Sequence, residues 1–123
     1  MLRVLVVEDD ELLRRALVRG LDGDAEVRDA GDAERAFAEL TGGARFDIIL
    51  LDLSVTDAVA FVARVEQIAA GQEHRVVLFT GVLAGDLAPD VRASVGGRVL
   101  EKPASLALIL DTARVLRERH GPP

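Results

Sequence analysis

The residues of this chain that are best suited to chemistry stand at the ends of short apolar stretches. Each is a carboxylate, a hydroxyl or an amine placed directly after a run of aliphatic side chains. In chain order they are Glu8, Asp9, Asp10, Asp52, Thr80 and Lys102. The stretch that ends in Asp52 is the most apolar of the four, which is typical of a strand buried on both faces.

Together these side chains could bind a cation and a phosphoryl group. Clustered carboxylates repel one another unless a cation neutralises them. Because no cysteine is present and the donors are oxygens, the preferred ion is a hard one such as Mg²⁺. The amine of Lys102 and the hydroxyl of Thr80 suit the oxygens of a phosphoryl group carried by Asp52. A carboxylate can itself be the nucleophile in phosphoryl transfer.

Each of these residues also has a simpler interpretation. Asp52 could cap the next helix or open a turn. Asp10 could favour the positive end of the first helix, Thr80 could be an ordinary strand-end residue, and Lys102 could be solvated. The chemical interpretation is favoured because polar residues of this kind follow or end four predicted strands, whose ends meet in a parallel sheet.

The pattern of apolar residues predicts five strands alternating with five helices. The predicted strands are 2–7, 26–30, 46–52, 75–80 and 98–101. Helices are expected between them, with Asp32, Thr56 or Asp57, and Ser105 as candidate N-caps and a short helix starting near Pro89. This alternation predicts one α/β domain with a doubly wound parallel sheet. In such sheets ligands bind where the strands end.

Composition excludes several other classes of protein. The formal net charge of -6 argues against direct binding of nucleic acid. The two histidines, His74 and His120, are far apart in the chain and are expected to lie apart, so a histidine metal site is not expected. No signal peptide or membrane-length apolar run is present, which predicts a cytoplasmic protein that contacts no membrane.

The strand-end motifs as a set resemble the receiver domain of two-component response regulators, the CheY-like group with a flavodoxin-like fold. The resemblance covers nearly the whole chain and places the receiver domain at residues 1–120, with a tail at 121–123. The matching motifs are Val6-Val7-Glu8-Asp9-Asp10, Ile49-Leu50-Leu51-Asp52-Leu53, Thr80-Gly81 and Glu101-Lys102-Pro103. The resemblance implies a (βα)5 fold with strand order 2-1-3-4-5.

The resemblance also implies a magnesium site and a phosphorylation site that share one residue. Asp52 would accept a phosphoryl group from a histidine kinase or a phosphotransfer protein. Mg²⁺ would be held by Asp9, by Asp52, by the backbone carbonyl of Ser54 and, mainly through water, by Glu8. A protein of this kind signals by conformational change and is not an enzyme beyond its own phosphorylation and dephosphorylation.

For the remaining motif residues the resemblance implies a switch. Thr80 would move toward the phosphoryl group and Lys102 would pair with it, and Pro103 would follow a cis peptide bond. The family commonly has Tyr or Phe three residues before the lysine, where this chain has Val99. Any output is therefore expected to come from motion of residues 81–97.

The loop after Asp52 also departs from the family pattern, with Thr56 and Ala60 where proline and glycine are usual. This difference leaves open a degenerate receiver that docks on a partner without phosphorylation. A hydrolase of the haloacid dehalogenase type, whose Asp-x-Asp-x-Thr motif is partly matched, needs an acid where Ser54 stands.

The last helix, whose core face is expected to include Leu106, carries two apolar residues on its opposite side. They are Leu108 and Val115, seven residues apart. With Val99 and the fourth helix they are expected to form a contact surface for a homodimer or an effector. The arginines Arg114, Arg117 and Arg119 are expected to form a solvated helix face.

Overall fold

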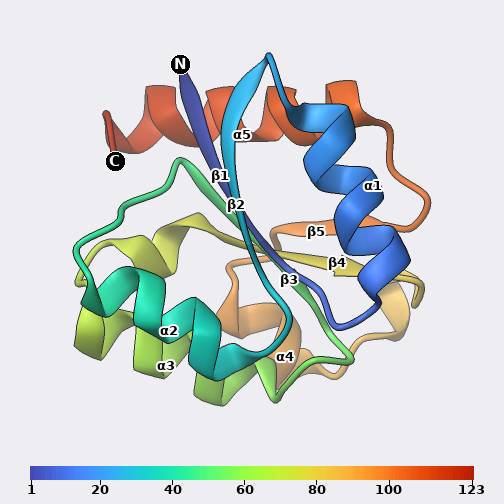
Figure 1. Cartoon of the computed structure of the whole chain (residues 1–123). Coiled ribbons are helices and arrows are strands. Elements are labelled where there is room, and N and C mark those ends of the chain that lie inside the picture. The colour runs from blue at the N-terminus through green and yellow to red at the C-terminus, as the bar shows by residue number, and fades with distance from the viewer.

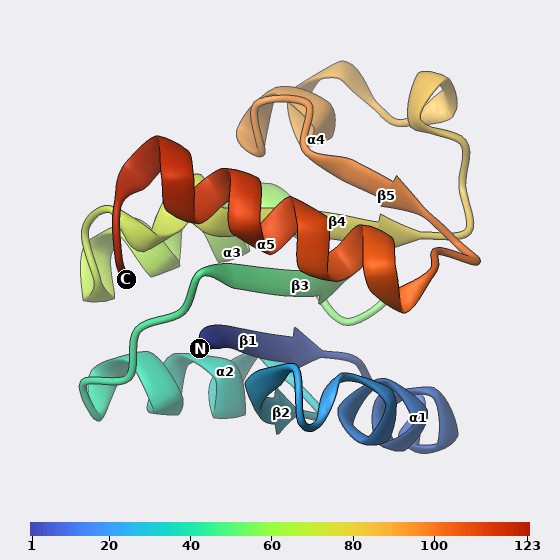
Figure 2. The ribbon, with the colours of Figure 1, turned by 90° about the horizontal axis from the view of Figure 1, so that it is seen from above.

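The computed structural model describes all residues, 1–123, and contains one five-stranded parallel sheet. The strand order is β2-β1-β3-β4-β5, as the resemblance implied. The strands are β1 (Leu2–Val7), β2 (Ala25–Ala30), β3 (Ile48–Asp52), β4 (Val76–Thr80) and β5 (Val99–Glu101). Seen from above, the arrowheads point the same way, so the carboxyl ends meet at one edge (Figure 2).

Five helices cover the two faces of the sheet (Figure 1). They are α1 (Glu11–Leu21), α2 (Ala33–Thr41), α3 (Ala58–Ile68), α4 (Pro89–Ser94) and α5 (Leu106–His120). Helices α1 and α5 pack on one face, and α2, α3 and α4 lie on the other (Figure 1). Two short 3-10 turns, η1 (Gln72–Arg75) and η2 (Ala84–Asp86), flank β4. No helix of the chain has the length and apolar character needed to cross a membrane.

The central strands are buried on both faces because their side chains point alternately into the two helical layers. Every residue of β3 and β4 is buried. Leu51 packs with the α2–α3–α4 layer, whereas its neighbour Leu50 packs with α1 and α5. The register pairs Val7 with Leu51 and Asp52 with Phe79, so successive strands end nearly level. This level edge positions the polar residues that follow.

The helices start where short polar side chains can accept backbone hydrogen bonds. Asp10 accepts from the amide of Leu13 at 3.1 Å and caps α1, which confirms the simpler interpretation of that residue. Asp57, not Thr56, caps α3. Helix α4 is only six residues long and has no side-chain cap.

Two packing predictions need correction. The central strand begins at Ile48 and not at Phe46, because the buried carboxylate of Asp47 accepts a hydrogen bond from the backbone amide of Arg3 at 2.8 Å. Leu106 is 38% exposed and lies at the edge of the core, where it contacts Gly20 of α1.

Candidate functional site

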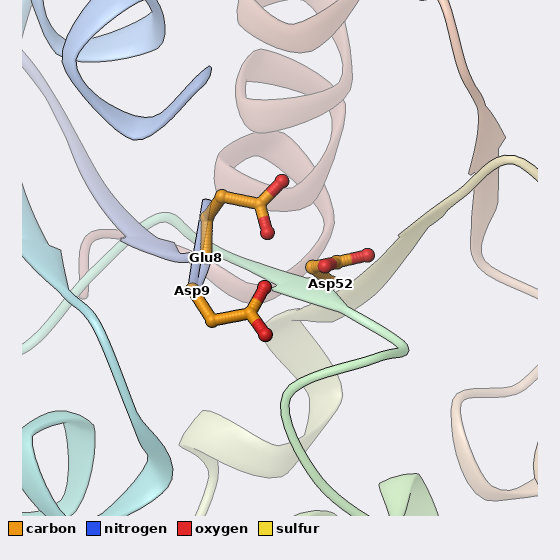
Figure 3. Close-up of side chains that lie close together, drawn as sticks. All are labelled: Glu8, Asp9 and Asp52. Atoms are coloured by element: carbon orange, nitrogen blue, oxygen red, sulfur yellow. The ribbon is translucent and has the colours of Figure 1, made fainter. Parts of the chain in front are cut away.

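The carboxylates of Glu8, Asp9 and Asp52 lie together where β1 and β3 end (Figure 3). Each offers an oxygen within 4.8 Å of the others. Glu8 and Asp52 are buried, whereas Asp9 is exposed. The parallel pairing of β1 with β3 brings residues of the two strands side by side although they are more than forty positions apart.

Lys102 bridges the two buried carboxylates. Its Nζ donates to Glu8 Oε1 and to Asp52 Oδ1, both at 3.1 Å. Burial alone would lower the pKa of Lys102, but the hydrogen bonds and charges of Glu8 and Asp52 outweigh it and raise that pKa. The backbone holds this residue in place, since its amide donates to the carbonyl of Thr80 at 2.7 Å. The Lys102-Pro103 peptide bond is cis, as expected.

Ser54 contributes its side chain to the site, which the sequence interpretation missed. Its hydroxyl donates to Asp52 Oδ2 and lies 3.3 Å from Asp9 Oδ1. The turn after β3 brings it back over the strand end, with the Val55 amide donating to the Asp52 carbonyl at 3.1 Å. A hydroxyl two residues after a strand-end carboxylate was the available sequence signal.

The two buried carboxyls differ strongly in acidity. Burial, together with the neighbouring carboxylate of Asp52, raises the pKa of Glu8 to about 7. Burial would raise the pKa of Asp52 too, but the neighbouring carboxyl of Glu8 and the hydrogen bonds from Ser54 and Lys102 lower it below the usual value. Near neutral pH Asp52 is therefore ionised while Glu8 is partly protonated. Of the pair, Asp52 is therefore the carboxyl group that carries a full negative charge near neutral pH.

Thr80 lines the same hollow but makes no hydrogen bond to the carboxylates. It is buried, and its Oγ1 accepts from the amide of Val82 at 3.0 Å. The hollow has a volume of about 590 Å³ and includes the acidic residues, Ser54, Thr80, Val82 and Lys102 in its lining. All predicted site residues are thus brought to one cavity.

The donor set of this cavity fits a hard divalent cation. Three carboxylates face one lysine, and Glu8 Oε2 is buried without a hydrogen-bond partner. An orphaned buried carboxylate oxygen is costly, and coordination to a cation would satisfy it.

Comparisons with known proteins support the architecture. No protein-family model matches the sequence, and no curated protein is significantly similar to it. Solved structures do match along nearly the whole chain. The receiver domain of a Francisella response regulator aligns with a TM-score of 0.76 at 17% identity, covering 97% of this chain and 98% of that one. The chain has the fold of a response regulator receiver domain.

Two further receiver-fold neighbours agree. A CheY-like receiver protein from Methanospirillum hungatei has a TM-score of 0.77 at 19% identity and covers 97% of this chain and 96% of its own. A two-component response regulator from Clostridium difficile has a TM-score of 0.78 at 16% identity, with coverages of 97% and 98%. The receiver fold places the acidic cluster at the sheet edge where the sequence predicted a ligand site.

Two predictions about residues outside the site need correction. His74 and His120 stack on each other, with ring centroids 5.7 Å apart, because η1 and the end of α5 meet in space. Arg114 and Arg119 are exposed as predicted, but Arg117 Nη1 lies 3.5 Å from the buried Asp47.

Proposed function

We propose that the protein is a two-component receiver whose Asp52 accepts a phosphoryl group, with Mg²⁺ as cofactor, from a histidine kinase or a phosphotransfer protein. The observation that carries the proposal is the bridge from Lys102 to Asp52 and Glu8 beside an acidic cluster. A solvated lysine would not be held by two buried carboxylates.

The reaction needs a nucleophilic oxygen at the wall of the cavity, which Asp52 lines, and neutralised charge. An Asp52 oxygen would attack phosphorus, and the bond from phosphorus to the donor's leaving atom would break, with the electron pair leaving on that atom. Lys102 stands within reach of both the Asp52 carboxylate and the incoming phosphoryl oxygens. Its positive charge would stabilise the negative charge on those oxygens during the transfer.

The residues proposed to hold the cation are Glu8, Asp9, Asp52 and the backbone carbonyl of Ser54. Bound Mg²⁺ would supply positive charge against the phosphoryl oxygens. The hydroxyl of Ser54 must release Asp52 Oδ2 if that oxygen is to react. The protein would act in the cytoplasm and catalyse no reaction beyond its own phosphorylation and dephosphorylation.

The test is intact mass after incubation with acetyl phosphate and Mg²⁺. The wild type should gain one phosphoryl group, whereas Asp52→Asn, or wild type in EDTA, should gain none. Asp22→Asn is the matched control because it makes the same change at an exposed residue outside the cavity, and it should be phosphorylated like the wild type. An Asp52→Asn protein that is still modified would exclude this site.

A second candidate is a degenerate receiver that docks on a partner without phosphorylation. Val99 favours it, because this half-buried residue packs against the α2–α3–α4 core and offers no ring to reorient. If neither acetyl phosphate modifies the wild type nor beryllofluoride binds it, this candidate replaces the first.

A further inference from the structure

A second polar cavity lies at the opposite end of the sheet from the acidic cluster. Its volume is about 340 Å³, and it is formed where η1, the loop before β3 and the end of α5 meet. In Figure 2 the C-terminus marks this end, beside the tails of the β3 and β4 arrows. The polar side chains of its lining are Arg45, Gln72, His74, Arg75 and His120. We call it the basic cavity.

The most buried cation of the basic cavity has an unused donor. The Arg75 side chain is 4% exposed, and its Nη2 donates to the carbonyl of Gly121 at 2.7 Å. Its Nη1 makes no hydrogen bond and lies 3.7 Å from Asp47 Oδ1. Asp47 is shared, because its other oxygen already accepts from the Arg3 amide and lies near Arg117. Arg75 is therefore charged, buried and only partly compensated.

The surrounding guanidinium groups add positive charge without acidic partners. Arg45 donates only to the carbonyls of Leu40 and Ala44. Arg98 donates only to the carbonyls of Val76 and Glu73. Neither arginine forms an ion pair with a carboxylate. Carbonyl oxygens satisfy the N–H groups but leave the full charge in place.

Several of these charges act on His120. Desolvation and the charges of Arg75, His74, Arg98 and Arg119 hold the pKa of His120 below its usual value. One carboxylate, that of Glu73, lies beside the histidine pair, with its Oε2 3.9 Å from His74 Nε2. A chain with a net charge of -6 thus gathers an excess of positive charge at one end.

We propose that the basic cavity binds a phosphate-type anion, either free inorganic phosphate or the phosphate of a small metabolite. Guanidinium forks match the oxygens of such an anion, and imidazole N–H groups can add donors. The cavity's size suits a phosphomonoester of modest size. An anion there would offset the charge of Arg75, which Asp47 compensates only in part.

This site is independent of phosphorylation at Asp52. Asp47 directly precedes β3 and Asp52 ends it, while Arg75 precedes β4 and Thr80 ends it. The two cavities therefore lie at opposite ends of the same two strands. Without Mg²⁺ the acidic cluster repels anions, so binding measured in EDTA reports on the basic cavity alone.

The test follows the imidazole signals of the two histidines by NMR during titration with inorganic phosphate. The titration is done in EDTA at fixed pH and ionic strength, with adenosine monophosphate as a second probe. We expect saturable shifts of His74 and His120. Tighter binding of adenosine monophosphate than of phosphate would indicate a metabolite, and equal or weaker binding would indicate free phosphate.

The variants Arg45→Gln and Arg119→Gln should each weaken binding, Arg45→Gln by about tenfold. Arg119 is exposed, so its replacement leaves the fold intact. Arg64→Gln is the matched control, because Arg64 lies on the exposed face of α3 and bonds only to Gln67; it should bind like the wild type. The proposal is overturned if chloride at equal ionic strength produces the same shifts, or if both Arg45→Gln and Arg119→Gln bind as tightly as the wild type.

Discussion

Glu8 is the residue whose environment most changes its chemistry. Its pKa is about 7 in the folded chain against an ordinary value of 4.5, because it is buried beside Asp52. The folded chain therefore holds this proton more tightly than the unfolded chain does. The resulting stability is fully present below about pH 4.5 and is lost as pH rises through about 7.

We expect Glu8→Gln, which resembles the protonated acid, to be more stable than the wild type at about pH 8 in EDTA, by about 5 °C in Tm. The difference should shrink toward about pH 5. Thermal unfolding followed by circular dichroism measures it. The lowered pKa of His120 has the opposite effect on stability near neutral pH, but it is common to both proteins and cancels in the comparison. Equal Tm differences at both pH values would contradict the prediction.

The sequence could predict Glu8, Asp9, Asp52 and Lys102 because each follows an apolar strand. Strand ends in a parallel sheet meet by geometry alone. It could not predict that the Ser54 hydroxyl bonds Asp52, or that His74 meets His120. Those contacts depend on where the turn after β3 and the end of α5 lie in space, and residue spacing does not determine these positions.

At the scale of elements, the segment between β4 and β5 holds only a short 3-10 turn and a six-residue helix. One anchor is the Glu101 carboxylate, which accepts from the Ala84 amide at 2.9 Å across the edge of the sheet. Helix α4 within the segment is short and lacks a side-chain cap. With Val99 packed against the core, we expect any response to phosphorylation to appear in this segment.

We expect beryllofluoride with Mg²⁺ to change amide hydrogen exchange in residues 81–97, by about tenfold at the most affected amides. Hydrogen exchange with mass spectrometry measures it, with β1 as the internal control. Glu101→Ala should raise exchange near Ala84 before any ligand is added, because it removes the anchor. If hydrogen exchange in residues 81–97 does not change when beryllofluoride binds, this segment does not carry the conformational response.

Helix α5 has an outer apolar surface formed by Leu108 and Val115, which are 46% and 47% exposed. Val99 was expected to join it, but it is half-buried against the opposite helical layer. The double substitution Leu108→Lys and Val115→Lys should weaken self-association by about tenfold, because it places two charges in the contact.

Sedimentation velocity over a range of concentrations tests this surface. Leu12→Lys is the control, since Leu12 is 80% exposed on α1 and lies outside the surface. If the double variant and the wild type sediment alike at every concentration, α5 does not mediate self-association.

The order of the elements follows from the sequence more reliably than their ends do. Alternating apolar runs predict five strands, and the observed strands agree within two residues. The start of β3 was placed too early because a buried aspartate cannot be recognised without its partners. Leu106 was assigned to the core from helical spacing alone, although it begins the helix at the rim of the sheet.

For the whole molecule, Asp47 joins segments that are distant in the chain. Its fully buried carboxylate contacts the start of β1 through Arg3, η1 through Arg75 and α5 through Arg117. Removing a buried charge from such a network leaves its partners uncompensated, at a cost of about 3 kcal/mol.

We therefore expect Asp47→Asn to lower Tm by about 10 °C. Differential scanning calorimetry measures the change. Asp111→Asn is the matched control, because Asp111 pairs with Arg114 on the exposed face of α5 and should shift Tm very little. A Tm for Asp47→Asn within a degree or so of the Asp111→Asn value would show that the network adds no stability.

The bridge made by Lys102 also has a consequence for how the protein is synthesised. Lys102 lies 94 residues after Glu8 and 50 residues after Asp52. At about 10 residues per second, a ribosome needs about 5 s to add the residues between Asp52 and Lys102. Throughout that interval the nascent chain carries Glu8 and Asp52 without the lysine that joins them. The carboxylates are thus made early and their counter-charge late, so the site is completed only when translation has passed β5.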